Sequence, residues 1–180
     1  MRKINEGGIN PEFNYISVNV SPLQFNQIGF VQDFIDVLQA YKIDSQQVRI
    51  EITENVAVDD IELTISKINQ LKEFGIHCML DDFGSGYSSL SYLNRLPLKA
   101  IKIDRSFVSN IDQSKYHQLI VKAVSDISNF SELECIAEGV ETQAEFEYLH
   151  SQQVGIFQGY YFHKPMPVDK FILLVAASTI

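Results

Sequence analysis

The chain alternates two hydrophobic patterns along most of its length. Short runs of apolar and β-branched residues indicate buried strands, because a strand covered on both faces does not alternate apolar with polar positions. Longer segments between these runs carry apolar residues at helical spacing. We expect strands at residues 15–20, 48–53, 77–80, 100–103, 134–137 and 156–162.

Helix-start signals mark several of the longer segments. Ser21 followed by Pro22 is typical of an N-cap with proline at the first helical position. Thr142 and Glu145 have the spacing of a capping box, in which the two residues satisfy each other's backbone N–H groups. We expect helices that cover approximately residues 22–38, 60–74, 115–129, 143–150 and 168–177.

Polar residues at the strand ends help to choose between two folds. Strands joined by helical crossovers run parallel, in an open doubly wound sheet or in a closed barrel. An open sheet gathers its ligand groups at one switch point, whereas a TIM-type (β/α)8 barrel draws them from many strands around one rim. Almost every predicted strand carries such a residue at or near its end: Asn19, Glu51, Asp81, Asp82, Lys102, Asp104, Glu138 and Gln158. The pattern favours the barrel.

The number of predicted strand–helix units is too small for a closed barrel. Closure needs eight units, and the chain provides six, the first of which begins after about a dozen residues. No linker or low-complexity segment interrupts the pattern. We therefore expect residues 1–180 to form a single α/β domain, an incomplete (β/α)8 barrel that lacks roughly its first two strand–helix units.

Charge and composition exclude some partners. A net charge of −9 argues against a large nucleic-acid partner, although clustered carboxylates can still bind a small phosphate ligand through divalent cations. No apolar run approaches the roughly 20 residues that cross a bilayer, so no membrane contact is expected. Cys78 and Cys135 lie in apolar, strand-like runs, which favours two reduced core thiols in a cytoplasmic protein over a disulfide.

The strongest local signal is the sequence DDFGSGYSSL at residues 81–90. Asp81 and Asp82 come where a strand gives way to a loop, and adjacent carboxylates can hold hard cations such as Mg²⁺ or Mn²⁺. Gly84 would let the loop turn tightly beside the metals. Alternatively, Asp82 only caps a turn. The other acidic residues at the rim make metal ligation the preferred interpretation.

Further charged residues lie at strand ends or shortly after them. Glu51 alternates with isoleucines, so the inner face of its strand is polar, and metal ligation is preferred over a structural salt bridge. Lys102 either stabilises charge on a phosphoryl oxygen or holds a nucleophilic water, or it pairs with Asp104 or a rim carboxylate, and spacing alone does not decide. Glu138 is a candidate metal ligand or base, whereas Glu141 fits a helix start or an ion pair.

The kinds of side chain at this rim indicate a reaction class. Carboxylates, one amide and one lysine, with no metal spacing among the four histidines, are typical of a two-metal hydrolase. In such a site the cations bind phosphate oxygens and lower the pKa of a bridging water. Phosphodiester cleavage is the natural reaction class, and these residues alone do not name the substrate.

Six segments, in chain order, resemble the motifs of the EAL-domain family of cyclic-di-GMP phosphodiesterases. They are VNVS at 18–21, EITE at 51–54, DDFGSGYSSL at 81–90, KIDRSFV at 102–108, AEGVET at 137–142 and QGY at 158–160. The ordered series spans essentially the whole chain and is far more specific than any single motif. The resemblance implies a (β/α)8 barrel that hydrolyses cyclic di-GMP to linear pGpG with Mg²⁺ or Mn²⁺.

The resemblance also implies roles for the rim residues. Three of them match metal ligands: Asn19, Glu51 and Asp81. Asp81 and Asp82 would serve the second metal, and Glu138 matches a metal-site or base carboxylate. The remaining catalytic candidates are Lys102, which matches the lysine near the attacking water, and Gln158, a supporting polar residue.

A second group of residues matches positions that support the loop after Asp82. Glu54 matches the glutamate that steadies this loop, with Gly84, Ser85 and Glu141 as further loop-supporting residues. The family uses this loop to couple dimerisation to activity. A homodimer is therefore an expected partner, besides cyclic di-GMP itself.

The Glu-Ala-Leu tripeptide that names the family does not occur in the chain. In the family, that segment supplies a metal ligand and substrate contacts. The leading hypothesis is an active phosphodiesterase with an upstream sensory or barrel-completing segment. The alternative is a noncatalytic cyclic-di-GMP receptor or protein-interaction module. A different barrel hydrolase would require the series of motifs to be accidental.

Overall fold

The computed structural model describes residues 15–84 and 93–178 of the chain. Within them, six strands form one sheet in which each strand pairs in parallel with the next along the chain. The strands are β1 (Ile16–Val20), β2 (Val48–Thr53), β3 (His77–Phe83), β4 (Ala100–Ile103), β5 (Glu134–Glu138) and β6 (Ile156–Gln158). Strand order equals chain order, as in a (β/α)8 barrel and unlike a doubly wound sheet. The expected incomplete barrel is confirmed.

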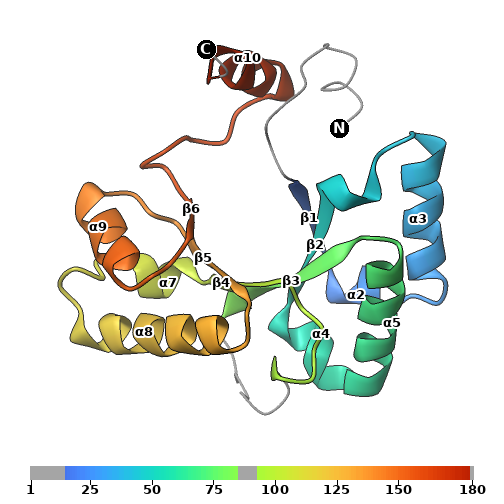
Figure 1. Cartoon of the computed structure of the whole chain (residues 1–180), viewed down its shortest axis with the longest axis horizontal. Coiled ribbons are helices and arrows are strands. Elements are labelled where there is room, and N and C mark those ends of the chain that lie inside the picture. The colour runs from blue at the N-terminus through green and yellow to red at the C-terminus, as the bar shows by residue number, and fades with distance from the viewer. Residues whose placement is uncertain (1–14, 85–92, 179–180) are drawn as a thin grey trace.

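The described helices alternate with the strands along the chain. They are α2 (Pro22–Phe25), α3 (Phe30–Ala40), α4 (Glu54–Asp59), α5 (Ile61–Glu73), α7 (Arg105–Val108), α8 (Lys115–Phe130), α9 (Gln143–Ser151) and α10 (Val168–Ser178), with a short 3₁₀ helix at Ser45–Gln47. Figure 1 shows α2 to α5 beside β1 to β3 and α7 to α9 beside β4 to β6, whereas α10 lies apart from the others. These helices therefore do not cover the inner face of the sheet, which carries side chains of the strands themselves.

Two hydrophobic clusters lie on opposite faces of the sheet. The larger one contains strand residues such as Ile50 and Ile101, together with the apolar faces of the helices. The smaller one consists of Met79, Ala100 and Ile136, with partly buried neighbours at its edge. Because side chains alternate along a strand, the residues between those of the larger cluster point to the inner face. This inner face carries the polar residues of the site.

Local signals set several element boundaries as expected. Ser21 accepts a hydrogen bond from the backbone N–H of Gln24 in a capping box at α2. Thr142 and Glu145 form the expected capping box at α9, and Asp60 accepts a hydrogen bond from the backbone N–H of Leu63 at the start of α5. Each cap depends only on residues within one helical turn, which explains why the sequence reveals it.

Three predicted boundaries are wrong. The first predicted helix is two helices, α2 and α3, because the chain turns at Gly29 with a positive φ of 86°. β3 continues through Phe83 with a register shift after Leu80. β6 ends at Gln158, because the backbone N–H of Phe162 turns back to the carbonyl of Gly159. The short helices α4 and α7 were not predicted.

The cysteines agree with one expectation from composition, and the helices can be compared with the length of a membrane span. Cys78 and Cys135 are both buried free thiols, as expected. Among the helices that the structure describes, none has the length and apolar character needed to cross a lipid bilayer.

Candidate metal centre

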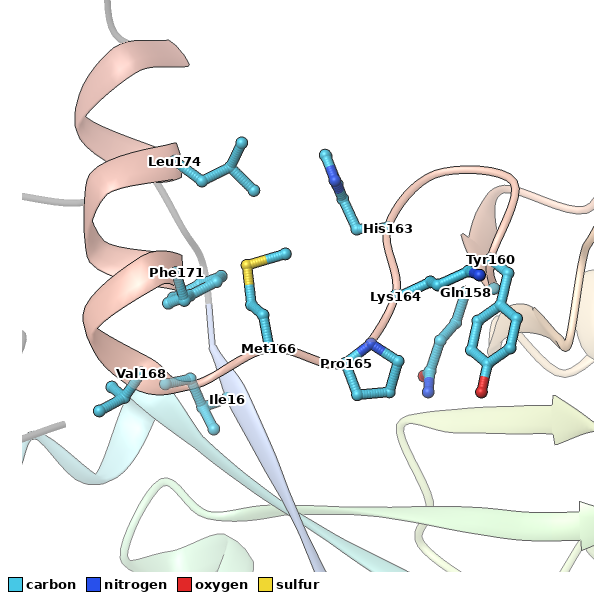
Figure 2. A pocket seen from close by; sticks show the side chains of 11 residues that line it. Ile16, Gln158, Tyr160, His163, Lys164, Pro165, Met166, Val168, Phe171 and Leu174 are labelled. Carbon is cyan, nitrogen blue, oxygen red and sulfur yellow. The ribbon is translucent and has the colours of Figure 1, made fainter.

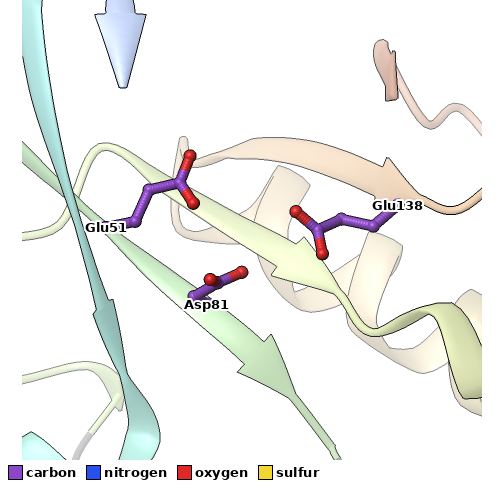
Figure 3. Close-up of side chains that lie close together, drawn as sticks. All are labelled: Glu51, Asp81 and Glu138. Atoms are coloured by element: carbon purple, nitrogen blue, oxygen red, sulfur yellow. The ribbon is translucent and has the colours of Figure 1, made fainter. Parts of the chain in front are cut away.

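Three strands bring carboxylates together at the C-terminal rim of the half-barrel. Glu51 comes from β2, Asp81 from β3 and Glu138 from the end of β5. Figure 3 shows the three side chains pointing toward one another. One oxygen from each of them lies within 4.8 Å of the others, a spacing at which a single cation could contact all three. Residues far apart in the sequence thus form one acidic cluster.

Asn19 joins this cluster from β1. In the parallel register its Cα pairs with that of Glu51, so the two side chains stand side by side. With its amide nitrogen toward the carboxylates, Asn19 donates to Glu51 Oε2 at 3.1 Å and to Asp81 Oδ2 at 3.2 Å. In the reverse orientation the amide oxygen of Asn19 faces the same carboxylate oxygens, an arrangement that a cation bound between these oxygens would stabilise. Asn19 therefore fits either a donor or a metal ligand.

Lys102 extends from β4 into the centre of the cluster. Its Nζ forms short ion pairs with Glu51 and Glu138 and lies 3.0 Å from Asp81 Oδ1. Burial alone would lower the pKa of Lys102, but the hydrogen bonds to Glu138 and Glu51 outweigh burial and raise it above its ordinary value. Of the partners considered for this lysine, the structure selects the rim carboxylates. Asp104 instead caps α7.

The donor set fits a divalent cation. Asp81 Oδ1 is a buried acceptor without a hydrogen bond, since Lys102 reaches it at ion-pair distance but not with hydrogen-bond geometry. Three carboxylates and one ammonium group leave a formal excess of two negative charges, which one divalent ion balances. Carboxylate and amide oxygens suit Mg²⁺, Mn²⁺ or Ca²⁺.

Glu138 has a raised pKa in this cluster. Burial raises the pKa of Glu138, and the charges of Asp81 and Glu51 raise it further, against the opposing effect of Lys102. A carboxyl group with a raised pKa exchanges protons closer to neutral pH. The rim therefore favours the protonated form of Glu138 more than water does.

Asp82 lies outside the three-carboxylate cluster. Its backbone has a positive φ of 54° where β3 changes register, and it is half-buried. Burial raises the pKa of Asp82, and the charges of Asp81 and Asp104 together with a hydrogen bond to Asp104 raise it further. Asp82 and Asp104 thus form a second group of acidic side chains beside the cluster of Glu51, Asp81 and Glu138.

Gln158 lies at the rim but also faces a cavity. Its Cα pairs with that of Glu138 at the end of β6. Figure 2 shows its side chain among those that line a cavity of about 500 Å³, which extends to Ile16 of β1 and Phe171 of α10. Apolar side chains make up most of this lining. The structure therefore places Gln158 between the acidic cluster and an apolar cavity.

The loop-supporting candidates lie in three different places. Gly84 turns the chain after β3 with a φ of 97°, and a Cβ there would lie 2.8 Å from the ring of Phe107. Glu54 is buried at the start of α4. Glu141 is exposed and forms a 2.6 Å ion pair with Arg105, as its interpretation as an ion-pair residue requires. Ser85 lies outside the described residues.

Sequence reasoning missed two charged residues on the inner face. Arg49 precedes Glu51 by two positions, and Glu134 precedes Glu138 by four, so each lies on the same side of its strand as the later carboxylate. Their side chains form an ion pair with each other. The period-two spacing in each strand predicts that both side chains face inward, but it does not predict that they pair with each other.

These features define a TIM-like half-barrel with an acidic rim, and comparison with known proteins identifies its family. Residues 1–165 match the model of the EAL domain family. The chain therefore belongs to the EAL domain family, which confirms the resemblance of its motifs.

Three similar proteins illustrate the family. MucR of Pseudomonas aeruginosa, a bifunctional diguanylate cyclase/cyclic di-GMP phosphodiesterase, is 35% identical over 161 residues, which cover 89% of this chain and 24% of MucR. The EAL domain of Mycobacterium smegmatis DcpA is 34% identical with a TM-score of 0.92, covering 98% of this chain and 78% of that one. The manganese and cyclic di-GMP complex of Klebsiella pneumoniae BlrP1 is 30% identical with a TM-score of 0.77, covering 88% and 40%. This chain thus corresponds to about a quarter of MucR.

Proposed function

We propose that this chain takes part in the hydrolysis of cyclic di-GMP to linear pGpG by a two-metal mechanism. The observation that carries the proposal is the convergence of Glu51, Asp81 and Glu138 around Lys102 at one rim. The similar proteins support the substrate, since MucR is a cyclic di-GMP phosphodiesterase and BlrP1 forms a complex with manganese and cyclic di-GMP.

The rim residues divide into metal-binding and charge-stabilising groups. In this proposal Asn19, Glu51 and Asp81 hold one Mg²⁺ or Mn²⁺, Asp81 and Asp82 contribute to a second, and Glu138 is either a further metal ligand or the base. When bound, the metals supply Lewis-acid stabilisation of phosphate oxygens and lower the pKa of a coordinated water. The assignment fits the clustered oxygens and the excess negative charge at the rim.

In this proposal Lys102 stabilises negative charge, Glu138 accepts a proton and Gln158 supports them. The raised pKa of Lys102 keeps its ammonium group protonated, so it stabilises negative charge on a phosphoryl oxygen and does not act as a base. Burial and the neighbouring carboxylates raise the pKa of Glu138, which suits it to accept a proton from the attacking water. Gln158, beside Glu138 in the sheet, supports this arrangement. Glu54, Gly84, Ser85 and Glu141 support the loop after Asp82.

Completion of the barrel is a further part of the proposal. We propose that residues 1–180 are one domain of a cytoplasmic protein and that an upstream segment supplies the missing barrel strands. DcpA supports this proposal, since this chain matches 78% of that EAL-domain structure. A homodimer formed through the loop after Asp82, and an upstream sensory segment, are proposed partners.

A hydrolysis assay tests the function. A chain extended upstream to include a strand that ends in Glu-Ala-Leu should convert cyclic di-GMP to pGpG when Mg²⁺ or Mn²⁺ is present, and chelation by EDTA should abolish turnover. Glu138→Gln should lower kcat by about 10²- to 10⁴-fold, the range for loss of a general base. Glu147→Gln, at an exposed position of α9, is the matched control and should leave kcat unchanged. No turnover by the extended chain would refute the proposal.

A noncatalytic cyclic-di-GMP receptor is the second candidate function. The ion pairs of Lys102 with Glu51 and Glu138 favour it, because they offset the charge of these rim carboxylates without a metal. Calorimetry with cyclic di-GMP on the 180-residue chain distinguishes the two functions. Micromolar binding by a chain that shows no hydrolysis even when extended would favour the receptor.

A further inference from the structure

A second ion pair crosses the interior of the half-barrel beneath the acidic rim. Nη1 of Arg49 in β2 donates to Oε2 of Glu134 in β5 in a short contact, and Nη2 lies 3.1 Å from Oε1. β3 and β4 lie between these two strands in the sheet. The pair therefore spans the concave side of the sheet and does not join neighbouring strands.

The same two strands carry both the lower ion pair and two of the upper carboxylates. Glu51 follows Arg49 by two positions, and Glu138 follows Glu134 by four, so all four side chains point to the inner face. Between the two polar layers lies the small apolar cluster that contains Ile136. The Arg49–Glu134 ion pair thus links β2 and β5 below the rim, and Glu51 and Glu138 face each other from the same two strands at the rim.

Several contacts hold the lower pair in one geometry. The guanidinium carbon of Arg49 lies 3.5 Å from the centroid of the Tyr15 ring, and Nη1 lies 3.8 Å from the sulfur of Met79. Lys99 approaches Glu134 Oε1 at 3.7 Å. A planar guanidinium that is both stacked and doubly hydrogen-bonded has little freedom to rotate. The Arg49–Glu134 pair therefore has little conformational freedom.

Stability alone does not explain why charged residues occupy these positions. The side chains of Arg49 and Glu134 are only 11% and 29% exposed, so both charges are largely desolvated. Apolar residues of similar volume often stabilise a protein as well as a buried ion pair does, because they avoid this desolvation. What an ion pair adds is a defined separation and orientation of the two strands.

We propose that Arg49 and Glu134 are positioning residues, which set the spacing between Glu51 and Glu138 and thereby the affinity of the rim for a divalent cation. The inference rests on the proposed metal site. Groups that orient metal ligands without touching the metal commonly change its affinity when they are substituted. Here the connection runs along two continuous strands, over two residues in β2 and four in β5.

Calorimetric titration of the 180-residue chain with Mn²⁺ and with Ca²⁺ tests the inference. In the double variant Arg49→Met/Glu134→Leu we expect Kd for Mn²⁺ to rise by about 10- to 100-fold. Arg49→Lys, which keeps the charge but loses the two-point contact, should give an intermediate value. The ratio of the two Kd values should also change, because the smaller ion tolerates altered ligand spacing less well. A purely structural role would not change this ratio.

A matched control and the pattern of Mn²⁺ binding distinguish failure of this inference from failure of the proposed metal site. Lys122→Gln/Asp126→Asn removes an exposed ion pair on α8 and should change neither Kd nor the ratio. If the native chain binds Mn²⁺ and the Met/Leu variant binds it equally well, the inference is wrong and the proposed metal site stands. If the native chain binds no Mn²⁺, the proposed site fails and the inference fails with it. Should the Met/Leu variant not fold, unchanged binding by Arg49→Lys overturns the inference and weaker binding supports it.

Discussion

The Nζ atom of Lys102 lies 3.0 Å from Oδ1 of Asp81, between carboxylates that arrive from three separate strands. In a metal-free protein this ammonium group is the positive charge that offsets them. Removing it leaves several buried carboxylates facing one another, and a divalent ion is the natural replacement. The relationship between the two residues therefore predicts how stability should respond to metal.

We expect Lys102→Met to lower the free energy of unfolding by about 3 to 5 kcal/mol without metal, the cost of breaking a buried ion pair. Saturating Mn²⁺ should restore more stability to the variant than it adds to the native chain. Urea denaturation with and without Mn²⁺ measures both effects. Lys122→Met, at an exposed position of α8, is the control and should change the free energy by less than about 0.5 kcal/mol. Equal effects of the two substitutions would contradict the central role of Lys102.

Gly159 should be intolerant of any side chain. A Cβ at this position would lie 2.1 Å from the carbonyl oxygen of Val140, which is backbone and must shift. We expect Gly159→Ala to destabilise the protein by about 1 to 3 kcal/mol, the range for overpacking. Gly155→Ala is the matched control, since a Cβ there meets nothing within 4 Å. Chemical denaturation of both variants measures the difference, and a tolerated Gly159→Ala would show that this close approach is absent.

Glu145 should contribute stability that depends on pH. Burial alone would raise the pKa of Glu145, but the backbone N–H groups of Glu141, Asn110 and Thr142 donate to it and lower its pKa overall. Since the folded-state pKa is the lower one, this contribution is present above the ordinary value of 4.5 and is lost as the pH falls through the folded-state pKa.

We therefore expect Glu145→Gln to cost about 1.5 to 3 kcal/mol at pH 7, the range for hydrogen bonds to a charged group. The difference from the native chain should shrink below pH 4.5. Denaturation over a series of pH values measures it. Glu147→Gln, exposed on the same helix, should show no comparable loss at any pH. A difference for Glu145→Gln that persists unchanged into acid would contradict the role of its negative charge.

The two cysteines should be unreactive in the folded protein. Burial raises the pKa of Cys78 to about 12, and it raises the pKa of Cys135 to about 11 against the opposing effect of a hydrogen bond with Ser128. Because the thiolate is the reactive form, labelling at pH 8 should be about 100-fold slower or more than in the unfolded chain. Ellman's reagent should detect both thiols only in denaturant. Rapid labelling of the native chain would show that the strands open readily.

The direction of the site residues followed from the sequence because strand periodicity is local. Glu51 lies between Ile50 and Ile52, and this alternation placed the carboxylate on the face opposite the larger hydrophobic cluster. The motif series named the family for a similar reason, since its residues are read one segment at a time. The end of β6 could not be read in this way. Its aromatic continuation favours a strand, but hydrogen bonds to Gly159 turn the chain there.

The sequence by itself determined the order of the six strands, the inward direction of Glu51 and Lys102 and the kinds of side chain at the rim, because these depend on spacing within a few residues. Only the tertiary structure decided that Lys102 contacts rim carboxylates while Asp104 caps a helix, and that Arg49 pairs with a residue 85 positions away. Such choices depend on how far the sheet curves and where its register shifts. Those properties arise from all the strands packing together, so no single segment encodes them.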